Sequence, residues 1–170
     1  MFSPDLLAQY PPAPLENWYR YNYFNNEFDI SGSGVEDYSF EEIRTMTKLQ
    51  YAELDQLMMH DTPTVGAVHL RQVLANKFAA GAAEKVMVTN GSNEALQLVV
   101  RAILHAGDEV ITLGPCYHCH DKIAAAIGCK VVQWELPIGK QQALDTAQLA
   151  RLITPATRAV ILNFPHNPSG

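Results

Sequence analysis

The second half of the chain alternates short apolar runs with segments whose apolar residues recur at helical spacing. Each apolar run is rich in β-branched and aliphatic side chains and is stopped by glycine, proline or asparagine, which is typical of a buried strand. Strands alternating with helices need crossover connections, which give a largely parallel sheet covered on both faces. The pattern therefore predicts an α/β fold. The expected strands are 85–89, 109–113, 130–134 and 158–162, and the expected helices are 93–105, 117–127 and 145–153.

Three loops that follow these strands carry residues suited to binding a ligand. They are residues 89–95, 114–117 and 163–170, after the first, second and fourth expected strands. The carboxyl ends of parallel strands open onto a crevice in which ligands of α/β sheets bind, so we expect the loops to converge on one rim. Taken one at a time, the alternatives are a tight capped turn, a core tyrosine and a proline-rich turn.

Two of the loops have features suited to particular ligand groups, residues 89–95 to an anion and residues 163–170 to a hydrogen-bond acceptor. Residues 89–95 place small residues and free backbone N–H groups at a helix start, where the helix dipole is positive. They lack the glycine spacing of a dinucleotide motif and the Gly-Lys-Ser/Thr of a P-loop, which disfavours a nucleotide. Prolines flank Asn167 and restrict its backbone, so its amide is held ready to donate a hydrogen bond.

Residues 165–170, Pro-His-Asn-Pro-Ser-Gly, resemble the His-Asn-Pro-Thr/Ser-Gly signature of class I and II aminotransferases. That family consists of fold type I enzymes that use pyridoxal 5′-phosphate (PLP). The resemblance implies that Asn167 hydrogen-bonds the phenolic oxygen of the PLP ring. It also implies part of a largely parallel-sheet large domain, preceded by an N-terminal arm.

The other two loops are similar to further elements of the same family. Residues 89–95 resemble its Gly-Ser-x-x-Ala segment, which assigns the PLP phosphate to Gly91, Ser92 and Asn93. Residues 114–117 resemble its Gly-Pro-x-Tyr element, which assigns stacking on the pyridine face to Tyr117. The order and spacing of all three matches favour a PLP site over three unrelated turns.

The first part of the chain differs in character. Four prolines in residues 1–15 exclude a continuous helix and predict an extended arm. Six aromatic residues follow within residues 18–28 and must be covered, either by their own domain or by a second subunit, as in fold type I dimers. The second alternative predicts a homodimer. We expect residues 1–60 to form the arm and a small-domain segment, and residues 61–170 the first, incomplete part of the PLP-binding large domain.

Helices are also expected in the first part of the chain. Ser39 and Glu42 have the spacing of a capping box, which predicts a helix start. Apolar residues at helical spacing over 70–78 predict another helix, with Thr64 as its cap. The loop 29–35 contains two glycines that let the backbone approach a ligand closely, although a solvent turn is equally compatible with the residues.

Several short stretches narrow the resemblance to cyclases that act on hydroxylated arginine. The residues that carry it include 13–18, 29–35, 53–58 and 163–170. The resemblance implies a PLP-dependent elimination of the side-chain hydroxyl, followed by closure of a cyclic guanidine of the capreomycidine or enduracididine type. The alternative is an ordinary class I or II aminotransferase that transfers an amino group to a 2-oxo acid.

A substrate with a guanidinium group pairs best with carboxylates. Ordinary family members carry a tyrosine near the position that Asp61 occupies, so Asp61 is predicted to bind the substrate. Glu16 and Asp37 are weaker candidates, and the resemblance implies that Gly34 lies beside the substrate carboxylate. No lysine here stands in the family's Schiff-base motif, so no catalytic residue is assigned and the chain is expected to be the N-terminal part of a longer enzyme.

Composition limits the partners and the compartment. The net charge of −6 and the pI of about 5.4 leave no basic stripe, which argues against nucleic acid and against an anionic membrane surface. The sequence shows neither an 18-residue apolar run nor a basic segment followed by an apolar one at its start, so a cytoplasmic protein is expected. Three cysteines predict free thiols in a reducing compartment.

One motif competes with the Tyr117 assignment. Residues 116–120 have the form Cys-x-x-Cys-His of a c-type haem attachment site, and with His118 they offer four potential zinc ligands. A haem c protein needs export, and four ligands in five residues cannot all point at one metal. A haem, a metal site and a redox cysteine pair are therefore disfavoured, and Cys129 is expected in the core.

Overall fold

The computed structural model describes residues 13–28, 30–32, 34–137, 139 and 143–170. The chain forms two compact units. The first holds the described parts of residues 1–18 and 89–170, and the second holds the described parts of residues 19–88.

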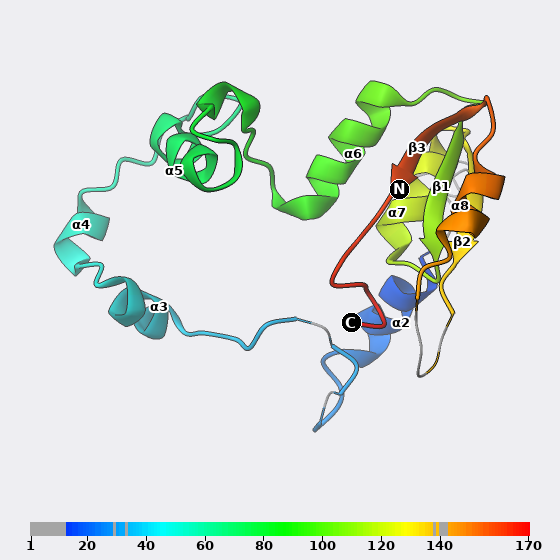
Figure 1. Ribbon diagram of the computed structural model, residues 1–170. Coiled ribbons are helices and arrows are strands. Elements are labelled where there is room, and N and C mark those ends of the chain that lie inside the picture. The colour runs from blue at the N-terminus through cyan, green and yellow to red at the C-terminus, as the bar shows by residue number, and fades with distance from the viewer. Residues whose placement is uncertain (1–12, 29, 33, 138, 140–142) are drawn as a thin grey trace, which may run out of the picture. The chain divides into compact units, whose positions relative to one another are not determined.

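A three-stranded parallel sheet forms the centre of the first unit (Figure 1). The central strand pairs on both sides and is buried along its whole length, as is usual for parallel strands. The predicted α/β fold with a parallel sheet is confirmed. The strands are β1 (Glu109–Gly114), β2 (Lys130–Glu135) and β3 (Thr157–Ile161), in the order β2-β1-β3.

Three helices flank this sheet, each close to its predicted position. Asp145 caps the last of them by accepting hydrogen bonds from the N–H groups of Ala147 and Gln148. The second ends at Ala126, close to its predicted end at residue 127, and Gly128 follows with φ +88°. The helices are α6 (Gly91–Ile103), α7 (His118–Ala126) and α8 (Thr146–Leu152).

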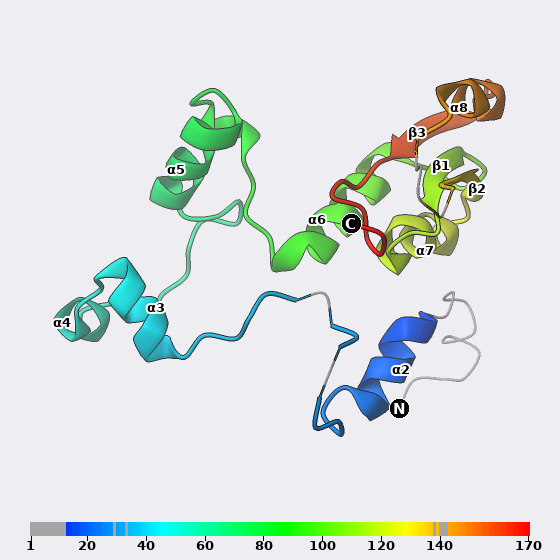
Figure 2. The same cartoon turned by 60° about the horizontal axis from the view of Figure 1, so that its bottom comes forward.

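The two faces of the sheet carry separate apolar clusters. Val110 of β1 packs with α6 and α7 on one face, in a cluster that also holds Cys129. Ile111 and Leu113 pack with Trp134 and α8 on the other. Successive side chains of a strand point to opposite faces, so β1 supplies both clusters. Figure 2 shows α7 and α8 on opposite sides of the strands.

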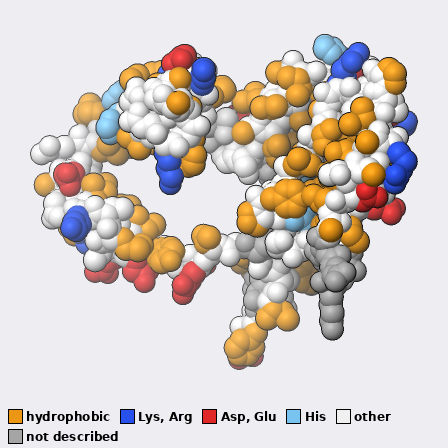
Figure 3. Space-filling view, in the orientation of Figure 1, with side chains coloured by type: hydrophobic (Ala, Val, Ile, Leu, Met, Phe, Trp, Pro, Cys, Tyr) orange, Lys and Arg blue, Asp and Glu red, His pale blue; other side chains and the backbone are white. Residues whose placement is uncertain are grey.

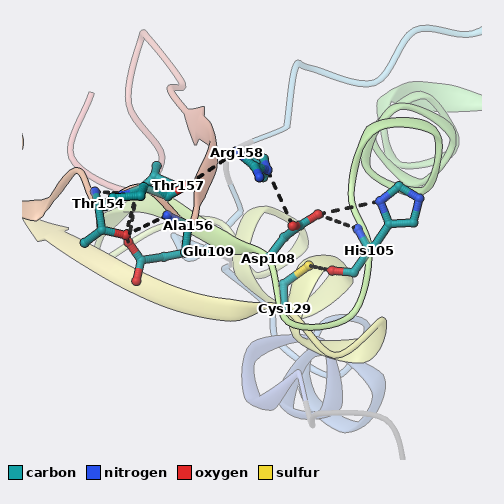
Figure 4. A network of polar contacts seen from close by, with 9 residues as sticks. His105, Asp108, Glu109, Cys129, Thr154, Ala156, Thr157 and Arg158 are labelled. Atoms are coloured by element: carbon teal, nitrogen blue, oxygen red, sulfur yellow. Dashed lines mark hydrogen bonds and ion pairs between the residues drawn. The ribbon is translucent and has the colours of Figure 1, made fainter.

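A polar network closes the amino-terminal edge of the sheet (Figure 4). The buried carboxylate of Glu109 accepts hydrogen bonds from Lys130 Nζ (2.8 Å) and from the hydroxyls of Thr157 (2.8 Å) and Thr154 (3.0 Å). These bonds, led by that of Lys130, outweigh burial and hold the pKa of Glu109 below its ordinary value. Next to it, Asp108 accepts a hydrogen bond from the backbone N–H of His105.

The second unit consists of short helices. α3 begins after Ser39, whose hydroxyl accepts from Glu42 N–H while the Glu42 carboxylate accepts from Ser39 N–H, so the predicted capping box is confirmed. Figure 3 shows hydrophobic side chains at the surface over α3 and α5. The elements are α3 (Phe40–Thr47), α4 (Tyr51–Asp55), α5 (Val68–Phe78) and the 3₁₀ turn η1 (Ala83–Lys85).

The predicted strand at residues 85–89 is wrong for the described residues, in which η1 ends at Lys85 and no strand follows before β1. A strand needs a neighbour that takes its backbone hydrogen bonds along its length. Here Val88 N–H donates to Val65 O (3.0 Å), and the guanidinium of Arg71 donates to the carbonyl oxygen of Val86 (2.7 Å). These single contacts replace a ladder.

The two other corrections concern helix starts. Thr64 is not the cap of α5, because Gly66 N–H donates to Pro63 O (2.7 Å) in a tight turn and the helix begins only after Ala67. The predicted extended arm is wrong beyond residue 13, because α2 (Pro14–Asn22) forms there. Pro14 stands at the first helical position, where its missing N–H is not needed. Residues 1–12 of the arm lie outside the described residues.

Candidate cofactor-binding site

The order of the strands places the candidate site. From β1 the chain crosses by α7 to β2, then returns by α8 to β3 on the other side of β1. Neighbouring strands whose connections run in opposite directions leave a crevice at their carboxyl ends. The loops after β1 and β3 flank this crevice.

The start of α6 is suited to an anion. Gly91 opens the helix with φ +79°, and a Cβ built on it would meet nothing within 4 Å. Ser92 and Asn93 follow, and all three residues are exposed. First-turn N–H groups have no partner within their own helix and lie at the positive end of its dipole, so this start can hold a phosphate.

Tyr117 stands directly before α7. The side-chain amide of Asn93 donates a hydrogen bond to its phenolic oxygen (3.3 Å), so α6 and the loop after β1 meet here. The rings of His118 and His120 lie against Tyr117, with centroids at 4.4 and 5.9 Å. The Asn93 bond lowers the pKa of Tyr117, but burial and the neighbouring Cys119 and Glu16 outweigh it and leave the pKa raised, so the phenol is protonated at neutral pH.

The loop after β3 holds Asn167 at the same edge. Asn167 N–H donates to the side-chain oxygen of Asn163 (3.2 Å), which fixes the backbone beside the amide. The ring of His166 lies between Ser169 Oγ (2.7 Å from Nδ1) and the carbonyl of Pro115 (2.9 Å from Nε2). The loops after β1 and β3 are therefore joined by a direct contact.

A pocket of about 350 Å³ opens between these loops. Its volume lies in the range of about 300–1,000 Å³ that is usual for small-molecule sites. At its margin, Glu16 Oε1 of α2 lies 3.7 Å from His118 Nδ1. The residues that line it are Pro14, Leu15, Pro115, Cys116, Tyr117, His118, Asp121, Lys122, Gln133, Asn167 and Pro168.

The residues present fit the predicted PLP. Its phosphate needs backbone donors, which Ser92 and Asn93 offer at the start of α6, where the N–H of Gly91 already donates to Thr89 O (2.9 Å). Its ring needs an aromatic face, which Tyr117 can supply, and its phenolic oxygen needs an amide donor, which Asn167 can supply. Both residues line the same pocket. Asn93 contacts Tyr117, so its side chain serves the phenol while its N–H can serve the phosphate. Gly91, Ser92 and Asn93 are not among the pocket-lining residues, and Asn93 is connected to the pocket through its hydrogen bond to Tyr117.

The predicted substrate residues lie mainly in the second unit. Gly34, Asp37 and Asp61 are exposed there, and a Cβ on Gly34 would meet nothing within 4 Å. Their roles stay predictions. Glu16 belongs to the first unit and is the one of these acidic candidates that contacts a pocket residue, His118, in the described part of the chain.

The competing cysteine motif forms no metal cluster. Cys116, Cys119 and Cys129 are free thiols. Burial is the main cause that raises the pKa of Cys116 and of Cys119, which favours thiols over metal-binding thiolates. Within the described ranges, no group of three or more histidine, cysteine or acidic side chains is placed to hold a metal ion. Nor does any helix in the described part have the length and apolar character needed to cross a membrane.

Comparison with known proteins agrees with this geometry. The chain is 43% identical to capreomycidine synthase from Streptomyces vinaceus over 162 residues, which cover 94% of this chain and 42% of that protein. It is 36% identical to arginine–pyruvate transaminase AruH from Pseudomonas aeruginosa, covering 74% of this chain and 34% of that protein. The chain thus spans less than half the length of these relatives.

Solved structures give the same result. The PLP-dependent cyclase OrfR superimposes with a TM-score of 0.85 at 41% identity, covering 94% of this chain and 42% of OrfR. Aspartate aminotransferase from Thermus thermophilus superimposes with a TM-score of 0.78 at 27% identity, covering 99% of this chain and 46% of that enzyme. The family described as aminotransferase class I and II matches residues 33–170. The chain belongs to the class I and II aminotransferase family.

Proposed function

We propose that this chain is part of a PLP-dependent cyclase that acts on a hydroxylated L-arginine. The observation that carries the proposal is the strand-end pocket, in which Tyr117 and Asn167 meet beside the start of α6. The likeness to capreomycidine synthase and to the cyclase OrfR, each over 94% of this chain, supports the cyclase reading.

Each part of the site has one task toward the cofactor. Gly91, Ser92 and Asn93 bind the phosphate through the start of α6. Tyr117 stacks on the ring and Asn167 donates a hydrogen bond to its phenolic oxygen. When bound, PLP supplies an electron sink for the charge that remains after a proton leaves the substrate Cα.

The proposed reaction is a dehydration with ring closure. The bond between a side-chain carbon and its hydroxyl breaks. A new bond forms between the same carbon and a guanidino nitrogen. The nitrogen gives up a proton and Cα regains one, so the net change is the loss of one water. Pro115, Tyr117 and Asn167 line the pocket, and the bound substrate would have to exclude from it the free water that competes with the guanidino nitrogen.

Carboxylates bind the guanidinium of the substrate in this proposal. Asp61 is the first candidate, with Glu16 and Asp37 as weaker ones. Glu16 gains support from its place at the pocket margin, 3.7 Å from His118. A carboxylate can accept two parallel hydrogen bonds from a guanidinium.

An ordinary aminotransferase is the second candidate, favoured by the 36% identity to an arginine–pyruvate transaminase. One experiment separates the two. The full-length enzyme, loaded with PLP, is incubated with β- and γ-hydroxyarginine, and in parallel with arginine plus pyruvate or 2-oxoglutarate. Mass spectrometry that finds a product lighter than hydroxyarginine by one water supports the cyclase, whereas amino transfer without dehydration rejects it.

We also propose a homodimer in the cytoplasm. Large apolar side chains of the second unit are strongly exposed, and a partner subunit would cover them. Free thiols suit a reducing compartment. The exposed side chains include Phe24, Phe28, Ile30, Val35 and Met59.

A further inference from the structure

We propose that His166 is a positioning residue that sets the separation between the amide of Asn167 and the ring of Tyr117. The inference rests on the proposed PLP site, because it concerns the two side chains that face the cofactor from different loops. His166 itself need not touch the cofactor.

The two contacts of the imidazole join the loops. Its Nε2 lies 2.9 Å from the carbonyl oxygen of Pro115, two residues before Tyr117. Its Nδ1 lies 2.7 Å from Ser169 Oγ, two residues after Asn167. Among the described hydrogen bonds, the one to Pro115 is the only one between the loop after β1 and the loop after β3.

The carbonyl partner fixes the direction of the first bond, and the direction of the second follows from it in a neutral ring. A carbonyl oxygen only accepts, so Nε2 carries the proton and donates to Pro115. In the neutral ring Nδ1 then accepts from the hydroxyl of Ser169. Both nitrogens are used, and the side chain is 4% exposed, so the ring has one orientation that satisfies it.

The rest of the loop passes this constraint to Asn167. Gly170 N–H donates to His166 O (2.6 Å) and Asn167 N–H donates to Asn163 Oδ1 (3.2 Å). The backbone on both sides of Asn167 is thus held by the loop itself, and His166 ties this braced loop to the other one. A shift of His166 would move the amide relative to Tyr117.

Three variants of the full-length, PLP-loaded enzyme test the role. His166→Gln can still reach Pro115 with an amide N–H, whereas the shorter His166→Asn cannot. Ser169→Ala removes the partner of Nδ1 and leaves the bond between the loops. Asn167→Ala is the reference for loss of the direct contact. The readouts are the PLP dissociation constant, the pH midpoint of the visible band of bound PLP, and the Tm without PLP.

The amide of Asn167 favours the ionised form of the cofactor's phenolic oxygen, so a misplaced amide raises the pH midpoint of the band. We expect His166→Asn to weaken PLP binding about tenfold and to raise the midpoint by up to about one unit, in the direction of Asn167→Ala. His166→Gln should restore most of both values, and Ser169→Ala should change them little.

A fall in Tm for His166→Asn with an unchanged midpoint overturns the proposal, because loss of fold alone would give that result. So does failure of His166→Gln to restore the midpoint. If the wild-type enzyme binds PLP but does not cyclise hydroxyarginine, the proposed reaction fails while the spectral result still decides the role of His166. If it binds no PLP, both fail.

Discussion

The side-chain amide of Asn93 donates a hydrogen bond of 3.3 Å to the phenolic oxygen of Tyr117. This contact joins the start of α6 to the loop after β1, which are proposed to bind different parts of the cofactor. Because the oxygen of Tyr117 accepts from Asn93, its own proton stays available to another acceptor.

Asn93→Ala is expected to raise the pKa of Tyr117 further, since the lost bond is the largest influence that lowers it. Removal of a neutral hydrogen bond costs about 1 kcal/mol, so PLP affinity should fall roughly fivefold. Ultraviolet titration at alkaline pH, with Tyr117→Phe subtracted, measures the first effect. A double-mutant cycle for PLP binding measures the coupling, and additivity of Asn93→Ala and Tyr117→Phe would show that the contact does not matter for the cofactor.

Gly91→Ala should weaken both folding and PLP binding. A φ of +79° costs a residue with a Cβ about 1–2 kcal/mol, and relaxation of that strain would displace the first N–H groups of α6. Denaturant unfolding and PLP titration measure the two effects.

Gly107 offers a matched control, with φ +92° and nothing within 4 Å of a built Cβ. It lies in the turn before β1, at the opposite edge of the sheet. Gly107→Ala should cost similar stability and leave PLP affinity unchanged. Equal losses of PLP affinity in both variants would show that general destabilisation is responsible.

Asp61→Asn should weaken hydroxyarginine binding about 10- to 100-fold, because a charged hydrogen bond is worth about 1.5–3 kcal/mol. Glu16→Gln should have a smaller effect, and Glu36→Gln, an exposed acidic residue of the second unit, should have none. The binding constants for hydroxyarginine and for norvaline, which lacks a guanidinium, separate recognition of the side chain from binding of the amino-acid part. Unchanged hydroxyarginine affinity in Asp61→Asn removes this residue from the site.

Glu109→Gln should destabilise the first unit at neutral pH and much less in acid. Hydrogen bonds from Lys130 and Thr157 lower the pKa of Glu109 in the folded state. A carboxyl with a lowered folded-state pKa stabilises the fold at pH above its unfolded value of about 4.3, and that contribution is lost as the pH falls through the folded-state pKa. Urea midpoints from pH 7 down to pH 3 should converge for the wild type and the variant. The exposed Glu84→Gln should follow the wild type throughout.

The elements from β1 onward could be predicted because each depends on local patterns. The strand cores are continuous apolar runs, Asp145 is a typical N-cap, and Gly128 supplies the positive φ at the end of α7. The parallel arrangement followed from alternation alone. The division of the chain at residue 60 stays a prediction, as do the roles of the site residues.

The wrong strand prediction has a long-range cause, whereas the two wrong helix starts were decided by the local turn at Pro63 and by Pro14 at the first position of α2. Residues 85–89 have the composition of a strand, yet their backbone groups form hydrogen bonds with the side chain of Arg71 and the carbonyl of Val65 instead of a neighbouring strand. His118, Asp121 and Gln133 line the pocket but match no sequence motif. His118 and Asp121 could have been found only from their closeness to Tyr117 in sequence, and Gln133 only from its place in β2. The proposed role of His166 depends on its contact with Pro115, 51 residues away in sequence, which no local pattern could predict.

The network around Glu109 lies at the amino ends of the three strands, and the candidate site lies at their carboxyl ends. One edge of the sheet therefore contributes stability and the other holds the candidate site, with the length of β1 between them. Stability could be improved at the amino-terminal edge and substrate preference changed at the carboxyl-terminal edge in separate rounds of selection. The network around Glu109 and the lining of the pocket share no residue.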